Sequence, residues 1–396
     1  MGDVRKYLKK LAKIPVLFFY YFLIFIKRVD SKIIIFESNL GRNYSGNPRF
    51  IYEEMVARGL DQVYQCYFVL EDTSITIPGN AKKIKRISMP YFLLFAKAGF
   101  WISDTRMPAY LYKRKRTVYI QTWHGTPLKR LALDMFHVDM EGESDLRTYQ
   151  KKFIKNVRTW DYLISQNSYS TEIFRRAFDF KKDILTIGYP RNDILLKQNN
   201  LKSIENIKKR FHLPPGKKIL LYAPTWRDNE HYGSHQYKFS IKIDFSLLQE
   251  QLGNEYIILL KAHYLVGEQL DLRGFEGFIY QFGPDVDIAE LYLISDMLIT
   301  DYSSVMFDYS ILNRPMLFFT YDLELYKDKL RGFYFDFLEE APGPVVKTSQ
   351  ELLVAIQEYN PWEYKTKYEE FRKKYNHADQ GNASEKVVDL ILSYGG

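Results

Sequence analysis

The sequence predicts an α/β protein of two domains, each built on a parallel β-sheet with helices on both faces. Three observations lead to this prediction. The chain has 396 residues, more than one ordinary hydrophobic core accommodates. Short apolar runs alternate with amphipathic segments from residue 31 onward. A polar stretch from residue 191 to residue 216, containing a double proline, separates two such series.

The apolar runs are the predicted strands. In the first series these are Lys32–Glu37, Val63–Leu70, Gly99–Ser103, Thr117–Thr122 and Tyr162–Ser165, with helices at Pro48–Gly59 and Ser168–Phe178. In the second series they are Lys218–Ala223, Glu255–Lys261, Phe278–Gln281, Met297–Thr300 and Pro315–Thr320. The segment from Pro361 to Tyr394 is predicted to be helical.

The expected domain organisation follows from these two series. Residues 1–30 form a basic and apolar segment, residues 31–200 a first Rossmann-like domain and residues 201–375 a second. Residues 376–396 form a C-terminal helix, and the sequence leaves open whether this helix crosses back to the first domain.

Composition restricts the partners and the compartment. A net charge of +8 favours a polyanionic partner: a nucleic acid, an anionic membrane or a phosphorylated substrate. No DNA- or RNA-binding motif is present and the basic residues cluster beside apolar ones at the N-terminus, so nucleic acid is not expected. The single cysteine, Cys66, excludes an internal disulfide and a cysteine-based metal site, and it fits a reducing cytoplasm.

The first thirty residues predict contact with a membrane surface. Five basic residues between positions 5 and 13 precede an apolar run, Ile14–Ile26, which Lys27 and Arg28 close. The run is shorter than the roughly 20 residues that a spanning helix needs, and no cleavage site for a signal peptide follows it. We therefore expect a peripheral anchor on anionic lipid at the cytoplasmic face. The alternative is a helix buried against the rest of the protein.

The first candidate for chemistry is His124, which follows a predicted strand and precedes Gly125, Thr126 and Pro127. Pro127 suits the first turn of a new helix, so the imidazole is expected at the carboxyl edge of the sheet. A neutral histidine at that position can accept a proton from an attacking hydroxyl. The alternative is a histidine that only hydrogen-bonds the turn.

The second candidate is the pair Lys261 and His263 at the end of a strand in the second series. Together they would hold phosphate oxygens and stabilise charge that develops during transfer. For Lys261, a solvated position at the edge of the strand is an equally good interpretation.

The third candidate is the segment that follows the strand Met297–Thr300. Asp301 ends the strand, and Ser303 and Ser304 precede an apolar-periodic helix. Serine hydroxyls and free N–H groups at a helix start make an anion site that suits a pyrophosphate. Plain N-capping by the serines would produce the same pattern.

Three weaker candidates lie at other strand ends or loops. The run from Tyr222 to Asp228 carries Thr225, Trp226 and Arg227 after a strand, and Arg331 precedes Gly332 and Phe333. Either arginine suits a phosphate group. The loop containing Gly41 follows the first strand and is a candidate acceptor site; it lacks the glycine fingerprint of dinucleotide binding.

Taken together, five motifs resemble those of the CDP-glycerol glycerophosphotransferases, which build wall teichoic acid in Gram-positive bacteria. These are the runs 123–127, 223–227, 261–263, 301–304 and 331–333, and the resemblance covers roughly residues 30–380. It implies a GT-B-like fold, in which two facing Rossmann-type domains enclose the active-site cleft.

The resemblance also implies roles for individual residues. His124 would be the general base and His263 would stabilise the transferred phosphoryl group, although these two roles remain exchangeable. The phosphates of CDP-glycerol would be held by Lys261, Thr225, Arg227, Asp301, Ser303, Ser304 and Arg331, and the acceptor side would include Gly41, Gly125 and Thr126. The reaction releases CMP, and neither a cofactor nor a metal is expected.

The family contains primases, which add the first glycerol phosphate to a disaccharide on undecaprenyl pyrophosphate, and polymerases, which extend the chain. The moderate length and the N-terminal anchor favour a primase, with a polymerase as the alternative. A nucleotide-sugar glycosyltransferase of the same architecture is the second alternative. A homo-oligomer and a complex with other teichoic acid enzymes both remain open. A non-enzymatic basic surface protein would leave function intact when His124 is replaced.

Overall fold

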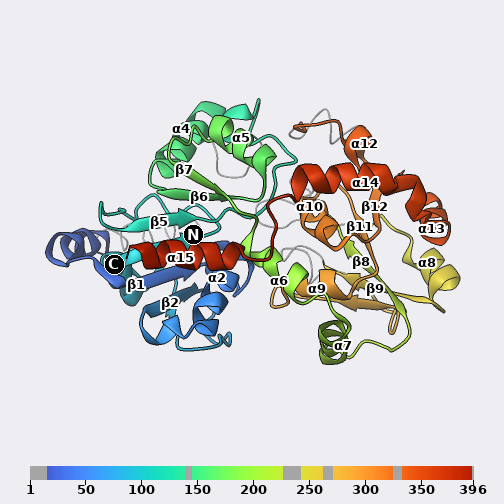
Figure 1. Ribbon diagram of the computed structural model, residues 1–396, viewed down its shortest axis with the longest axis horizontal. Coiled ribbons are helices and arrows are strands. Elements are labelled where there is room, and N and C mark those ends of the chain that lie inside the picture. Colours follow the sequence, from blue (N-terminus) through green and yellow to red (C-terminus); the bar gives the residue numbers. More distant parts are fainter. Residues whose placement is uncertain (1–15, 139–144, 226–241, 262–270, 324–331, 395–396) are drawn as a thin grey trace, which may run out of the picture.

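The computed structural model describes residues 16–138, 145–225, 242–261, 271–323 and 332–394. The chain forms two parallel β-sheets that lie side by side (Figure 1). The first sheet has the spatial order β3 (Lys82–Lys85), β2 (Gln65–Leu70), β1 (Asp30–Glu37), β4 (Ala98–Ser103), β5 (Val118–Gln121), β6 (Tyr162–Ser165) and β7 (Asp183–Thr186). The second has the order β10 (Ile279–Gln281), β9 (Tyr256–Leu260), β8 (Lys218–Ala223), β11 (Met297–Thr300), β12 (Met316–Phe319) and β13 (Val345–Val346).

Both sheets have the Rossmann strand order, in which the chain starts in the middle and winds outward in both directions. The winding direction reverses between β1 and β4 in the first sheet and between β8 and β11 in the second. In open sheets of this kind, ligands bind outside the carboxyl ends of the strands at this reversal. The fold therefore offers two switch points, one in each sheet.

Helices cover both faces of the first sheet. On one face lie α2 (Gly46–Ala57) and α15 (Ala383–Ser393), which share a hydrophobic cluster with β1, β2 and β4. On the other lie the helical residues 16–26, α3 (Met89–Phe95), α4 (Leu146–Val157) and α5 (Ser168–Ala177). The final helix α15 thus belongs to the layers of the first sheet, and residues 376–382 cross from α14 (Pro361–Tyr375) to reach it (Figure 1).

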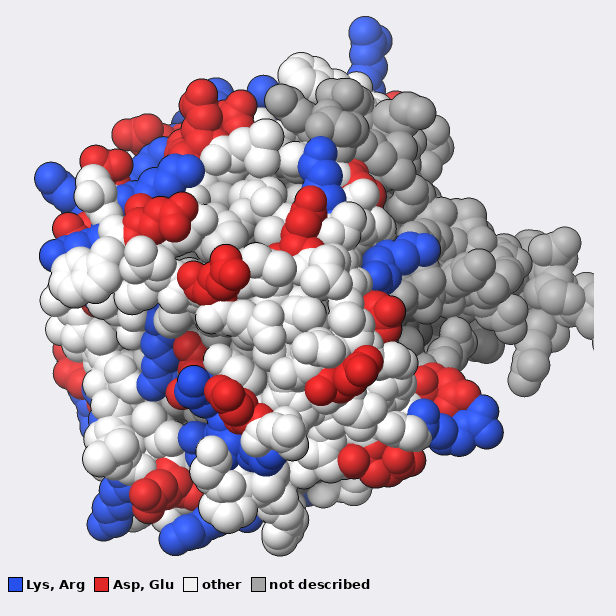
Figure 2. All heavy atoms as spheres, turned by 90° about the vertical axis from the view of Figure 1, so that its right-hand side faces the viewer, with Lys and Arg blue, Asp and Glu red and all other residues white. Residues whose placement is uncertain are grey.

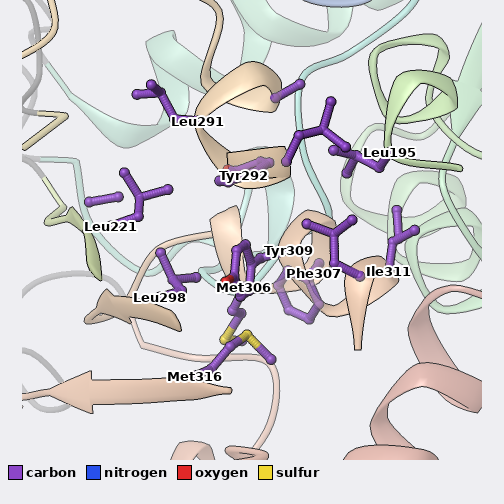
Figure 3. Packing of buried hydrophobic residues seen from close by; sticks show 14 of the residues in the cluster. Leu195, Leu221, Leu291, Tyr292, Leu298, Met306, Phe307, Tyr309, Ile311 and Met316 are labelled. Atoms are coloured by element: carbon purple, nitrogen blue, oxygen red, sulfur yellow. The ribbon is translucent and has the colours of Figure 1, made fainter. Parts of the chain in front are cut away.

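The second sheet is covered in the same way. One face packs against α6 (Asp193–Lys197), α7 (Leu201–Arg210), α9 (Ile288–Ile294), α10 (Val305–Tyr309) and α14, and the other against α8 (Phe245–Leu252) and α13 (Ser349–Gln357). Leu195 of α6 joins the cluster that holds Tyr292, Phe307 and Ile311 (Figure 3). Short elements complete the fold: α12 (Phe337–Glu340) and the 3-10 turns Asn39–Gly41, Leu60–Gln62, Ala132–Asp134, Pro190–Asn192 and Ser310–Leu312.

Several helices begin at a side chain that caps the first free N–H groups. The carboxylates of Asp145 and Asp244 and the amide oxygens of Asn167 and Asn200 each accept from a backbone N–H three residues later. Helix α13 starts with a capping box between Thr348 and Glu351. These caps satisfy donors that the helix itself leaves unpaired.

All ten predicted strands are present, with ends within two residues of the prediction. The strands β3, β7 and β13 were not predicted. In β3 only Ile84 is buried among three lysines, so no apolar run marks it. Residues 361–394 form two helices, α14 and α15, and Gly381 with φ +73° lies in the non-helical stretch between them.

No helix in the described part of the chain is both long and apolar enough to cross a membrane. Figure 2 shows the end of the second domain that faces away from the first. There the described Lys and Arg side chains alternate with Asp and Glu, and no single sign dominates (Figure 2).

Candidate active site

His124 lies on an unusual turn after β5. Trp123 has φ 52°, in the left-handed region that residues with a side chain rarely adopt. Its N–H donates to the side chain of Gln121 (2.9 Å), and the amide of Asn47 donates to the carbonyls of Thr122 (3.2 Å) and Trp123 (2.9 Å). Backbone strain of this kind persists only where the surroundings hold it. Asn47 is 1% exposed, so the support comes from the interior of the protein.

The ring of His124 has a defined proton arrangement. Its Nδ1 lies 2.8 Å from the carbonyl oxygen of Asp104. Because a carbonyl only accepts, Nδ1 must carry the proton, and Nε2 of the neutral ring is left as an acceptor. The indole of Trp123 stacks on the ring with 4.6 Å between centroids. These two contacts fix both the tautomer and the orientation of the ring.

The imidazole of His124 keeps exposed surface although protein atoms surround it closely. Desolvation lowers the pKa of His124, the charges of Arg191 and Arg106 lower it further, and the hydrogen bond to Asp104 opposes them. His124 is therefore neutral at neutral pH. A neutral, oriented imidazole with a free Nε2 is suited to accept a proton.

The second sheet approaches this turn through Ser304. A Cβ atom on Gly125 would lie 2.9 Å from the hydroxyl oxygen of Ser304 and 3.3 Å from its Cβ. Gly125 thus allows the carboxyl ends of β5 and β11 to meet. Ser304 makes no capping bond, whereas the Ser303 hydroxyl accepts from the N–H of Val305 at 3.4 Å. The following helix α10 has only five residues, so its dipole is weak.

Asp301 and Thr225 lie at the switch point of the second sheet. Asp301 is 3% exposed, and its carboxylate accepts from the backbone N–H of Thr225 at 2.9 Å. The side chain of Asp301 thus joins the ends of β8 and β11. Thr225 is brought to this edge as predicted from the sequence.

Lys261 lies at the end of β9, where the motif predicted it. Its ammonium group donates to the carbonyls of Gly283 and Val286 (2.7 Å to the latter), and desolvation lowers its pKa. It is therefore not a solvated edge residue. The loop that it holds contacts the first domain, since Asn43 donates to the Pro284 carbonyl at 3.2 Å and the Gly46 N–H to Asp287 at 3.2 Å.

Gly332 forms part of a second contact between the sheets. Its carbonyl accepts from the N–H of Arg130 (3.2 Å), and Lys129 and Phe333 form an isolated antiparallel bridge. Gly332 has φ +66°, and a Cβ there would lie 3.4 Å from the Arg130 Nε, so glycine suits the position. His263, Arg227 and Arg331 lie outside the described residues.

Two predicted acceptor-side residues have internal roles. Thr126 is 2% exposed, and its hydroxyl donates to Gln166 (2.5 Å) and accepts from Asn167 (3.1 Å). Thr126 is therefore held among polar groups of the first domain. Gly41 is also buried; it has φ +81°, and a Cβ there would lie 3.3 Å from the Arg86 Cδ.

A buried polar cluster joins the two domains beside His124, and sequence reasoning missed it. Arg191 pairs with Asp308 of α10, and Asn192 donates to the same carboxylate at 2.9 Å. Asp379 accepts from Gln166 at 3.0 Å, and desolvation raises its pKa to about 7. The stretch 191–216, predicted as a polar boundary between the domains, therefore begins inside the interface between them. In the sequence, the only signal for this cluster was the polar run directly after a sheet edge.

In the described part of the chain, no three His, Cys, Asp or Glu side chains are grouped to hold a metal ion. What the geometry provides is a proton acceptor, His124, next to Gly125, the residue at which Ser304 of the second sheet approaches the first. Such an arrangement can activate a hydroxyl next to a bound anionic substrate.

Comparison with known proteins identifies relatives along the whole described fold. The family described as CDP-glycerol:poly(glycerophosphate) glycerophosphotransferase matches residues 19–393. The teichoic acid poly(glycerol phosphate) polymerase of Bacillus subtilis (strain 168) is 49% identical over 92% of this chain, which spans 49% of that protein. The polymerase of the same description from Bacillus spizizenii is 44% identical over 92% of both chains.

A solved structure of the wall teichoic acid polymerase TagF has a TM-score of 0.90, 41% sequence identity and coverage of 99% of this chain and 97% of that one. A variant of that polymerase soaked with CDPG has the same TM-score. The teichoic acid glycerol-phosphate primase of Bacillus subtilis (strain 168) is more distant, at 34% identity over 71% of this chain and 69% of the primase.

Proposed function

Because this chain belongs to the CDP-glycerol:poly(glycerophosphate) glycerophosphotransferase family, we propose that it extends a lipid-linked glycerol phosphate chain. CDP-glycerol is the donor, the hydroxyl at the free end of the chain is the acceptor, and CMP is released. The higher identity to polymerases than to a primase supports extension over the first addition that the chain length suggested. Length does not discriminate, since this chain covers 92% of one of the polymerases.

The observation that carries the proposal is the fixed tautomer of His124. With Nδ1 bound to the Asp104 carbonyl, Nε2 takes the proton of the acceptor hydroxyl. The oxygen then attacks the phosphorus that bears glycerol, the bond to CMP breaks, and the negative charge passes to the leaving phosphate. His124 is neutral at working pH because its pKa is lowered, so no proton has to leave the ring first.

The donor is assigned to the second domain. Thr225, Ser303 and Ser304 lie at or beside its switch point, where open α/β sheets bind their ligands. His263, Arg227 and Arg331 complete the proposed phosphate contacts. Lys261 acts through the loop 283–286 that it holds, and one ammonium N–H remains for an anion beyond the two carbonyl bonds.

A transfer assay tests this function. The purified chain is mixed with CDP-glycerol and either the unprimed disaccharide lipid or the same lipid bearing one glycerol phosphate, and products are resolved by mass. Extension of the primed lipid alone, lost in His124→Asn, is the expected result. A single addition to the unprimed lipid would identify a primase instead. Absence of CMP with both lipids would contradict the donor assignment, and UDP-sugars would be tested next.

We further propose that the protein works on the cytoplasmic face of the membrane, held by residues 16–26. This helix exposes Phe18 (77%), Phe22 (52%) and Phe25 (90%), while its other side packs by Tyr20 on Phe92 of α3. Aromatic side chains at this density suit the boundary of a lipid bilayer. Replacing the three phenylalanines by serine should abolish sedimentation with vesicles containing phosphatidylglycerol. Unchanged sedimentation would contradict the role of this helix.

A further inference from the structure

Glu37, the last residue of β1, is a fully buried carboxyl group without a hydrogen bond. Its side chain is 0% exposed, and neither carboxylate oxygen has a hydrogen-bond partner among the described residues. The nearest cation is Arg86, whose Nε lies 3.7 Å from Oε1 and is itself buried without a partner. Buried charges are normally paired and fully hydrogen-bonded, because the desolvation cost is otherwise several kcal/mol. Two opposed, unsatisfied groups at this separation leave hydrogen-bonding capacity for a third molecule.

The surroundings of this pair are polar and reach the surface. Desolvation raises the pKa of Glu37 to about 7; Arg86 lowers it, while Asp104 and Glu71 raise it. The side chain of Arg86 is 17% exposed whereas Glu37 is fully buried, so the pair meets solvent only on the side of the guanidinium group. The charge of Glu37 also acts on three phenols, those of Tyr91, Tyr110 and Tyr119.

The pair lies at the switch point of the first sheet. Glu37 ends β1, and Asp104, whose carbonyl orients His124, follows β4 on the other side of the reversal. The Asp104 carboxylate accepts from the N–H of Asn39 at 2.8 Å, so the loop after Glu37 is tied to the residue that holds the histidine. The corresponding point of the second sheet holds Thr225 and Asp301, on the donor side. Since ligands bind at the switch points of such sheets, and the donor is proposed to bind at the second one, the first switch point is left for the acceptor.

Tyr110 links the pair to the aromatic N-terminal helix. The hydroxyl of Tyr21 donates to the carbonyl of Tyr110 at 3.3 Å, and the phenol of Tyr110 interacts electrostatically with Arg86 and Glu37. One residue, Tyr110, thus contacts the helix proposed to meet the membrane and faces the charged pair.

From this placement we propose that Glu37 and Arg86 form an acceptor subsite for a phosphate ester and its neighbouring hydroxyl, behind the hydroxyl that reacts at His124. The inference rests on the proposed function. The partly exposed guanidinium group of Arg86 donates to a phosphate oxygen, a contact for which this group is well suited. The carboxyl group of Glu37 hydrogen-bonds the hydroxyl. Gly41 is part of this subsite because its lack of a Cβ leaves room for the Arg86 side chain.

The test compares Arg86→Gln and Glu37→Gln with Lys85→Gln, which removes a positive charge from the adjacent, exposed residue. CMP release is measured against the concentration of primed lipid and, separately, of CDP-glycerol. We expect Arg86→Gln to raise the KM for the acceptor about tenfold or more, since one charged hydrogen bond is lost. The KM for CDP-glycerol should stay within about twofold, and Arg86→Lys should restore part of the acceptor binding. Lys85→Gln should resemble the wild type.

The phosphate could belong to the glycerol phosphate chain or to the pyrophosphate of the lipid carrier. Inhibition by a soluble, lipid-free glycerol phosphate trimer separates these sources. If the chain occupies the subsite, Arg86→Gln weakens inhibition by the trimer as well; if the carrier occupies it, inhibition is unchanged while the acceptor KM rises. An unchanged acceptor KM in folded Arg86→Gln and Glu37→Gln would overturn the subsite and leave a water-filled structural pair.

A failure of the subsite proposal can be distinguished from a failure of the proposed function. If the wild type releases no CMP with either lipid, the function has failed, and binding of the trimer is then measured directly by calorimetry. Weaker binding to Arg86→Gln than to Lys85→Gln would still support the subsite, and equal binding would overturn it. Thermal melting shows whether each variant is folded, and Glu37→Gln, which keeps the shape of the side chain, remains informative if Arg86→Gln is not.

Discussion

Glu37→Gln should make the protein more stable, and only at the higher end of the pH range. Burial raises the pKa of Glu37 from its ordinary value of 4.5 to about 7. Between these values the folded protein binds more protons than the unfolded chain, so stability is lost as the pH rises from 4.5 to 7 and stays constant above that. The change in pKa corresponds to about 3 kcal/mol. Glutamine cannot ionise and avoids this loss.

Urea unfolding at pH 4.5, 6 and 8.5 measures the effect, followed by the fluorescence of the buried Trp101 and Trp160. The difference in the free energy of unfolding between the variant and the wild type should be at its baseline at pH 4.5 and should be about 3 kcal/mol larger at pH 8.5. The baseline contains any cost of burying the amide and does not depend on pH. Glu71→Gln, at a carboxylate that is 55% exposed, is the control. A difference that is the same at all three pH values would refute the reasoning.

Three further predictions concern the catalytic region. His124→Asn should lower the transfer rate about 10²–10⁴-fold, while calorimetry shows that CDP-glycerol binding is unchanged. Because the pKa of His124 is lowered, the wild-type rate should decline only below the ordinary histidine pKa of 6.5. A decline centred above that pH would contradict the role of His124 as the base. Gly125→Ala should reduce kcat because its Cβ would meet the Ser304 hydroxyl at 2.9 Å; thermal melting shows whether the variant is folded, and an unchanged rate would contradict the tight contact between the two sheets. Asp308→Asn should destabilise the protein by about 3–5 kcal/mol in urea unfolding, because Arg191 would remain as a buried charge without its partner; a loss below about 1 kcal/mol would mean that the pair is hydrated.

The sequence predicts the strands well because a strand buried on both faces is a continuous apolar run. Met297–Thr300 and Lys218–Ala223 lie in the middle of the second sheet and have the predicted bounds. The strand β3 lies at the edge of the first sheet and consists of Lys-Lys-Ile-Lys, so only its hydrogen bonds to β2 identify it. Without β3, the position of Arg86 at a strand end could not be predicted either.

The same contrast holds for the site. His124 was predicted because it comes shortly after an apolar strand, and by that rule Asp104, which follows Ser103 at the end of β4, could also have been found. The hydrogen-bond and ion-pair partners around this site could not be predicted from the sequence. The bond from Asn47 to the Trp123 carbonyl joins residues 76 positions apart, and the Arg191–Asp308 pair spans 117 positions and two domains. Such contacts depend on how the sheets are placed, and no local pattern contains that information.

Because the two sheets are placed by their own set of contacts, different residues control substrate binding and the rate of transfer. Each switch point is assembled within one sheet: Glu37 and Asp104 in the first, Thr225 and Asp301 in the second. The distance between the two half-sites depends on contacts between the two sheets, namely Gly125 with Ser304 and the cluster of Arg191, Asp308 and Asp379. Orientation of reactants supplies a large part of the barrier reduction in enzymes, and a misplacement of about 1 Å can cost about a hundredfold in rate. Changes in the interface should therefore lower kcat while both KM values are retained, whereas changes at Glu37 or Arg86 should act on the acceptor KM alone.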